Sequence, residues 1–79
     1  MNEITRSQAM KVAAVRRAAK DGSARRARID AGLSLRDIAG PCGVAASTVL
    51  RWEAGRTPRA AAALRWGAVL ADIEKVLQA

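Results

Sequence analysis

Ser47 and Arg51 lie four residues apart, a spacing that places two side chains on the same face of a helix. A serine hydroxyl can bond a donor or an acceptor on a base edge, and a guanidinium can bond O6 and N7 of guanine together. Ala46 and Leu50 repeat the spacing and could pack against thymine methyl groups. These four residues are candidate DNA base contacts, with plain solvent exposure of Leu50 and phosphate neutralisation by Arg51 as the alternatives.

The composition argues against catalysis and metal binding. The chain has no histidine, no tyrosine and one cysteine, so it lacks a cysteine and histidine metal cluster and the usual nucleophile and base pairs. Its carboxylates are scattered along the sequence. We therefore expect no enzyme activity, no cofactor, no metal site and no small-molecule ligand. Cys42 is expected to be a small buried apolar group in an interhelical turn, with a redox sensor as the alternative.

Two short helical patterns would position the candidate base contacts. The first is expected over residues 35–39, because Ser34 can cap it and apolar residues recur within it at i, i+3 and i+4. Pro41 lacks an amide hydrogen and disfavours helical dihedrals in the residue before it. We therefore expect the chain to turn over residues 40–44, where Gly43 can adopt the positive φ of a sharp reversal.

The second helical pattern follows that turn. Val49 and Trp52 recur at three-residue spacing and can pack inward, which leaves the candidate base contacts on the outer surface. Because Val49 shares its face, Trp52 fits the core better than it fits a base-stacking role. Gly55 is expected to end the helix as its C-terminal cap. Two helices joined by a short turn within residues 32–58 have the arrangement of a helix-turn-helix.

The order of residues in this segment resembles the Cro and lambda-repressor-like helix-turn-helix family, of the xenobiotic response element type. The resemblance covers about residues 24–70 and is carried by Arg28, Gly32, Leu33, Ser34, Ile38, Ala39, Gly43, Val44, Thr48, Val49, Trp52, Glu53, Gly55 and Pro58. It implies an all-α fold, a compact bundle of about five helices around a central helix-turn-helix.

The resemblance also implies a sequence-specific, double-stranded DNA-binding transcription regulator. In particular it implies a small phage Cro-like repressor that occupies an operator through its recognition helix. An antitoxin or a recombination accessory protein with the same fold is one alternative. Nonspecific architectural DNA binding is another, which Ala45 and Ala46 favour because they open the recognition helix where relatives carry polar residues.

In relatives, residues that flank the recognition helix contact phosphates, and an internal ion pair joins the leading helix to the recognition helix. The resemblance assigns this ion pair to Arg28 and Glu53. Leu35 stands where many relatives carry a glutamine that contacts a backbone phosphate. A leucine has no side-chain amide to make that contact. The candidate phosphate contacts in and around the motif are Leu35, Arg36, Thr48, Arg56, Thr57 and Arg59.

The charge of the chain favours a polyanionic partner. The formal net charge is +7 and the pI is near 11.4. The charge is uneven, because residues 1–34 contain eight Lys or Arg against three acids, whereas residues 60–79 contain two of each. DNA fits this balance, but RNA or an anionic membrane would be attracted equally. The excess of arginine over lysine suits phosphate or guanine contacts, although a GC-rich genome explains it as well.

Residues 1–22 are expected to add an N-terminal helix, over about residues 7–20. Its apolar stripe consists of Val12, Val15 and Ala19. Its candidate phosphate contacts are Arg16 and Arg17. The alternatives are an extra core helix with a solvated charged face, and a segment that stays disordered until DNA binds. Ser23 is expected to cap the next helix, over residues 24–31.

Residues 59–79 are expected to form a C-terminal helix, with Thr57 as its cap and Pro58 at its first position. Its apolar stripe consists of Trp66, Leu70, Ile73 and Leu77. Gly67 interrupts the helix at a cost of about 1 kcal/mol. Core packing explains Trp66 and Leu70, but five short helices offer little surface to cover the other apolar residues of this segment. We therefore expect a homodimer through the C-terminal helix, with a monomeric core as the alternative. The dimer contacts would be Val69, Ile73, Val76 and Leu77.

The length of 79 residues suits one domain over residues 1–79, with the helix-turn-helix region at 23–58. No apolar run approaches the roughly 20 residues of a membrane span, and the N-terminus lacks a signal-sequence pattern. We therefore expect no membrane partner and a cytoplasmic location. The setting would be a prokaryotic cell or a phage-infected host, in association with the nucleoid.

Overall fold

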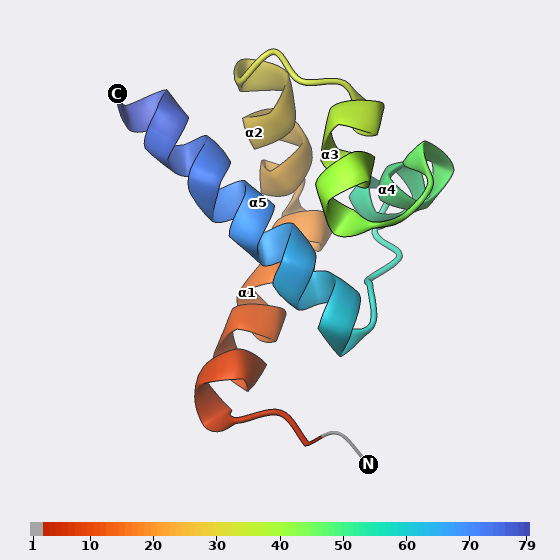
Figure 1. The fold of residues 1–79 in the computed structure, drawn as a ribbon, viewed down its shortest axis with the longest axis vertical. Coiled ribbons are helices and arrows are strands. Elements are labelled where there is room, and N and C mark those ends of the chain that lie inside the picture. Colours follow the sequence, from red (N-terminus) through yellow and green to blue (C-terminus); the bar gives the residue numbers. More distant parts are fainter. Residues whose placement is uncertain (1–2) are drawn as a thin grey trace.

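The computed structural model describes residues 3–79, which fold into five α-helices without a β-strand in the described part. Figure 1 shows α1 (Arg6–Asp21), α2 (Ser23–Asp30), α3 (Leu35–Cys42), α4 (Ala46–Glu53) and α5 (Ala60–Gln78). α5 runs diagonally across the molecule and crosses α1, while α2, α3 and α4 lie together on one side of it. None of the helices in residues 3–79 is long and apolar enough to cross a membrane. The expected all-α bundle of about five helices is confirmed.

One hydrophobic core draws on all five helices. It contains two tryptophans, Trp52 of α4 and Trp66 of α5, whose ring centroids lie 5.0 Å apart with an interplanar angle of 34°. The core position predicted for Trp52 is therefore confirmed. The other buried apolar side chains are Val12, Val15, Ala19, Ala24, Ile38, Ala39, Cys42, Val49, Ala63 and Ile73. The inner face of α4 is thus anchored in the middle of the molecule.

Gly67 allows α1 and α5 to approach closely. A Cβ atom built at Gly67 would lie 2.7 Å from Cγ2 of Val15, which is closer than van der Waals contact permits. Val15 is buried and β-branched, so it has little freedom to move aside. Glycine at this position costs about 1 kcal/mol in helix propensity, but it allows α1 to pack closely against α5.

Gly67→Ala is expected to lower the free energy of unfolding by about 1 to 2 kcal/mol, because the clash with Val15 outweighs the gain in helix propensity. In a Val15→Ala background, which removes the clashing methyl group, the same substitution should be neutral or stabilising. Urea denaturation of the four proteins measures both effects. Stabilisation by Gly67→Ala in the wild-type background would contradict the close packing of α1 on α5.

The two N-terminal helices begin where side chains satisfy their first amides. α1 starts one residue earlier than predicted, because Thr5 and Gln8 form a capping box in front of it. The prediction that Ser23 caps the second helix is wrong, since Ser23 is the first residue of α2. Its amide donates to Oδ1 of Asp21 at 2.8 Å. The side chain that accepts from an amide at the start of α2 is therefore the carboxylate of Asp21 and not the hydroxyl of Ser23.

The predicted start of the C-terminal helix at Pro58 is also wrong. α5 begins at Ala60 with Arg59 as its N-cap, and Thr57 does not cap it. Pro58 is buried, and its carbonyl accepts hydrogen bonds from the Arg16 guanidinium of α1. This long-range contact holds the chain extended in front of α5, and it outweighs the local helix-start preference of a Thr-Pro pair.

Candidate nucleic-acid interface

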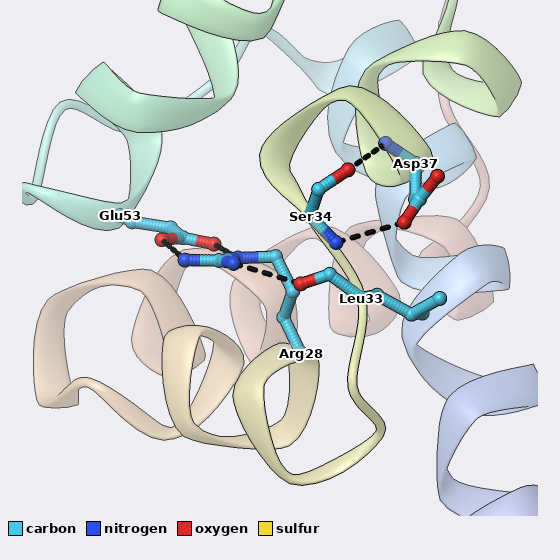
Figure 2. Close-up of polar contacts among 5 residues, drawn as sticks. All are labelled: Arg28, Leu33, Ser34, Asp37 and Glu53. Atoms are coloured by element: carbon cyan, nitrogen blue, oxygen red, sulfur yellow. Dashed lines mark hydrogen bonds and ion pairs between the residues drawn. The ribbon is translucent and has the colours of Figure 1, made fainter.

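α3 begins at Leu35 with Ser34 as its cap, as predicted. The Asp37 amide donates to Oγ of Ser34 at 3.0 Å, and the Ser34 amide donates to Oδ2 of Asp37 at 2.8 Å. Figure 2 draws both contacts. The hydrogen bonds from Ser34 lower the pKa of the Asp37 carboxyl. A charged carboxylate therefore lies at the positive end of the helix dipole and strengthens the start of α3.

The predicted end of this helix at residue 39 is wrong. α3 continues to Cys42 and contains both Gly40 and Pro41. The longer helix places the Cys42 side chain in the core with no exposed surface, and burial raises the pKa of its thiol. Cys42 is therefore buried as predicted, but it lies in α3 and not in the turn. The connection to α4 shortens to residues 43–45.

Two contacts satisfy the carbonyls at the end of α3. Gly43 has a left-handed φ of 69°, and the amide of Val44 donates to the Ala39 carbonyl at 3.1 Å. Nε of Arg65, from α5, donates to the Cys42 carbonyl at 2.9 Å. A positive side chain at the negative end of the helix dipole adds to this stabilisation. The contact from Arg65 is tertiary, and it stabilises the end of α3 directly after Pro41, which cannot make its own helical hydrogen bond.

α4 buries one face and exposes the other. Val49 and Trp52 pack in the core, as predicted. Ser47 and Arg51 are exposed, and Leu50 leaves 55% of its surface open to solvent. We call Ser47, Leu50 and Arg51 the outer face of α4. Its three side chains provide a hydroxyl, an apolar group and a guanidinium on one short helix.

Ala46 does not belong fully to this outer face. It is half-buried and packs against the core, so the predicted surface position is only partly right. The N-cap of α4 is Ala45, whose side chain makes no capping hydrogen bond. Apolar packing, and not a polar cap, therefore secures the start of α4.

A largely buried ion pair ties α4 to α2. Nε and Nη2 of Arg28 donate to the two carboxylate oxygens of Glu53 at 2.7 and 2.9 Å, a bidentate arrangement. Nη1 of the same guanidinium donates to the Leu33 carbonyl at 2.9 Å (Figure 2). The side chains of Arg28 and Glu53 expose only 12% and 3%. Hydrogen bonding to Glu53 raises the pKa of Arg28, and the pair fixes the C-terminal end of α4.

We call residues 54–59, between α4 and α5, the α4–α5 loop. Gly55 takes a φ of 105°, and the Arg56 amide donates to the Arg51 carbonyl at 3.0 Å, so the chain reverses directly after α4. The C-cap is Ala54, one residue earlier than the predicted cap at Gly55. The exposed residues of the loop include Arg56, Thr57 and Arg59.

The other candidate phosphate contacts differ in exposure. Arg36 is exposed on α3, and Arg17 is exposed on α1. Thr48 is half-buried on α4. Leu35 is half-buried and packs against the core, so its side chain supports α3 from the inside and offers no polar group to a phosphate.

Two arginines make long-range contacts that the sequence analysis missed. Nε and Nη2 of Arg16 both donate to the Pro58 carbonyl at 3.2 Å, across 42 positions of the chain. Arg65 reaches the Cys42 carbonyl across 23 positions. No local pattern signals such contacts, because an arginine on a helix surface looks the same in sequence whether or not its head group reaches a distant carbonyl.

The predicted dimer contacts on α5 are only partly available to a partner. Ile73 lies in the core and Val69 is half-buried, so both side chains are largely used within the chain. Val76 and Leu77, by contrast, expose 66% and 44% of their surface. Leu77 borders a hollow of about 350 Å³ between α2 and α5. Any apolar contact with a partner at this end of α5 would therefore centre on Val76 and Leu77.

Comparison with known proteins identifies the same segment of the chain. A family model described as a helix-turn-helix domain matches residues 23–74. The match begins at the first residue of α2 and ends inside α5, so α1 lies outside it. A search of curated proteins and a search of solved structures found no match.

Proposed function

Because the chain belongs to the helix-turn-helix domain family, we propose that it is a sequence-specific, double-stranded DNA-binding transcription regulator. The form of regulation that we propose is a Cro-like repressor, which excludes polymerase by occupying an operator. The outer face of α4 carries the proposal, because the core and the Arg28–Glu53 pair hold this exposed face in a fixed position. The protein would act at the nucleoid, in the cytoplasm of a prokaryotic cell or a phage-infected host.

In this proposal α4 lies in the major groove and its outer face contacts base edges. Arg51 is exposed and forms no ion pair within residues 3–79, so its guanidinium is free to bond O6 and N7 of a guanine. Ser47, which lies one turn before Arg51 on α4, would bond another base, and Leu50 would pack against a thymine methyl group. Three side chains make a sparse set of base contacts, so phosphate contacts supply much of the affinity.

Phosphate contacts would flank α4 on both sides. Arg36 on α3 and the arginines of the α4–α5 loop are exposed and positively charged. The formal net charge of +7 adds a long-range attraction that does not depend on base sequence. These groups would set the register of the protein on the duplex, while the outer face of α4 selects the sequence.

Arg56→Ala and Arg59→Ala are each expected to weaken binding to all duplex sequences alike. If each guanidinium neutralises one phosphate, the plot of log Kobs against log salt concentration should become shallower by about one unit per substitution. Fluorescence anisotropy titrations at several salt concentrations measure this slope. Lys75→Ala removes one exposed charge near the C-terminal end of α5 and should leave the slope unchanged. Unchanged slopes for both arginine variants would place the α4–α5 loop away from the phosphates.

The regulatory function is tested by capturing genomic fragments of the source organism on the tagged chain and sequencing them. We expect a few short segments upstream of genes to be enriched over the rest of the genome. Deletion of the gene that encodes the protein should raise expression of the genes next to these segments. Recovery of all fragments with equal efficiency would contradict sequence specificity and would favour architectural DNA binding.

We also propose a homodimer through the C-terminal end of α5, where Val76 and Leu77 are exposed. A two-fold dimer would place two copies of α4 on successive half-sites of an operator. Sedimentation at micromolar concentration should detect the dimer with or without a duplex, and a monomer in both conditions would remove it. If the chain is instead an antitoxin or a recombination accessory protein, the same surface would bind a toxin or a recombinase encoded by a neighbouring gene.

A further inference from the structure

α1 lies outside the segment that the helix-turn-helix family model matches. It is nevertheless firmly packed, because Val12, Val15 and Ala19 bury its inner face against the core. One side chain of α1, Arg16, reaches away from this packing to the α4–α5 loop. An anchored helix outside the family segment thus contacts the loop that follows the proposed recognition helix.

The Arg16 contact fixes the end of the loop nearest to α5. Nε and Nη2 donate to the Pro58 carbonyl at 3.2 Å each. This carbonyl belongs to the residue before the N-cap, Arg59, so it takes no part in the hydrogen bonding of α5. Pro58 itself is buried. The contact therefore holds a carbonyl that the local helix leaves free.

The end of the loop nearest to α4 is fixed by the backbone. The amides of Gly55 and Arg56 donate to the carbonyls of Trp52 and Arg51, each at 3.0 Å. Arg56 lies inside the restrained stretch, and Arg59 directly follows Pro58 at its far end. The loop that carries these two arginines is therefore held at both ends, by the backbone contacts near α4 and by the contact between Arg16 and Pro58 near α5.

We propose that Arg16 is a positioning residue for DNA binding. From α1 it holds the α4–α5 loop in the conformation that presents Arg56 and Arg59 to the phosphates. The inference rests on the proposed function, and it replaces the direct phosphate contact expected for Arg16 from the charge of its segment. Arg25 of α2 is the control, because it is an exposed arginine outside the candidate phosphate contacts and has no side-chain hydrogen bond within residues 3–79.

Two substitutions at Arg16 separate positioning from phosphate contact. Arg16→Ala removes the donor and the charge, whereas Arg16→Gln keeps an N–H donor the same number of bonds from Cα as Nε and removes only the charge. We expect Arg16→Ala to weaken duplex binding about tenfold, the scale of one charge-assisted hydrogen bond. Arg16→Gln should bind as well as Arg25→Gln. Equal weakening by Arg16→Gln and Arg16→Ala would overturn the proposal, because a phosphate contact needs the charge.

A double-mutant cycle with Arg59→Ala provides an independent test of the same role. If Arg16 acts through the loop, Arg59→Ala should weaken binding little further in the Arg16→Ala background. In the Arg25→Ala background, Arg59→Ala should keep its full effect. Additive losses with Arg16→Ala would overturn the proposal, since they would show that the two arginines act separately.

The free protein reports on the loop without any DNA. In ¹H–¹⁵N spectra, Arg16→Ala should move the amide signals of Arg56, Thr57 and Arg59, while Arg16→Gln and Arg25→Ala should leave them in place. Unmoved signals in folded Arg16→Ala would overturn the positioning role even if DNA binding stands. If Arg16→Ala does not fold, Arg16→Met keeps the aliphatic stem and removes the donor. A wild-type chain that binds no duplex would reject the proposed function, while the amide shifts still decide whether Arg16 restrains the loop.

Discussion

Glu53→Ala is expected to lower the free energy of unfolding by about 3 kcal/mol, because it leaves the guanidinium of Arg28 buried without its carboxylate. Of the three hydrogen bonds that Arg28 donates in the structure, only the one to the Leu33 carbonyl would remain. The pair also joins α2 to the end of α4, so the remaining folded protein should bind DNA more weakly.

Urea unfolding followed by circular dichroism measures this loss. Glu74→Ala removes an exposed carboxylate from α5 and should change the free energy of unfolding by no more than about 0.5 kcal/mol. Replacing both partners, Arg28→Met with Glu53→Leu, should recover much of the loss, because neither charge is then buried alone. A loss for Glu53→Ala no larger than the loss for Glu74→Ala would show that the pair contributes little to the fold.

Arg51→Ala is expected to weaken binding to a preferred duplex by about 1 to 3 kcal/mol, the range for one bidentate contact with a base pair. Binding to a scrambled duplex should fall much less, because it loses only the contribution of one positive charge. The ratio of the two affinities, which measures specificity, should therefore drop.

Affinities for the preferred and the scrambled duplex, measured at one salt concentration, test this expectation. Arg25→Ala removes another exposed arginine, from α2, and should leave the ratio of affinities unchanged. If Arg51→Ala weakens both duplexes equally, Arg51 neutralises a phosphate and the base readout must lie elsewhere on α4.

The sequence predicts the elements whose signals are local. Ser34 marks the start of α3 because a serine in front of an apolar helical pattern can bond the first amides, and the structure contains that cap. The three-residue spacing of Val49 and Trp52 predicts the inner face of α4, and both residues are buried. Once the helix forms, its periodicity fixes the face on which each residue lies. The residues of the outer face of α4 are therefore predictable as well.

Errors occur where tertiary contacts override a local preference. Pro41 ordinarily ends a helix, but burial of Cys42 and the hydrogen bond from Arg65 carry α3 past it. Pro58 ordinarily starts a helix, but the contact from Arg16 delays the start of α5. Both overriding contacts come from residues more than twenty positions away, so no window along the sequence reveals them.

The site is predictable to the same limited degree. The types and spacing of Ser47, Leu50 and Arg51 select the outer face of α4, and their exposure fits a reading surface. The half-burial of Ala46 and the bond between Arg16 and Pro58 depend on how the helices pack, so they follow only from the structure.

Selection of binding sites from random duplexes tests the central claim, that the outer face of α4 reads DNA sequence. We expect the wild-type chain to enrich a motif that contains a guanine at a fixed position, repeated with inverted orientation about one helical turn away if two copies bind. Arg51→Ala should lose the preference for that guanine and keep the preferences at other positions. Recovery of sequences no different from the starting pool, by a folded chain that still binds duplex DNA, would contradict the claim.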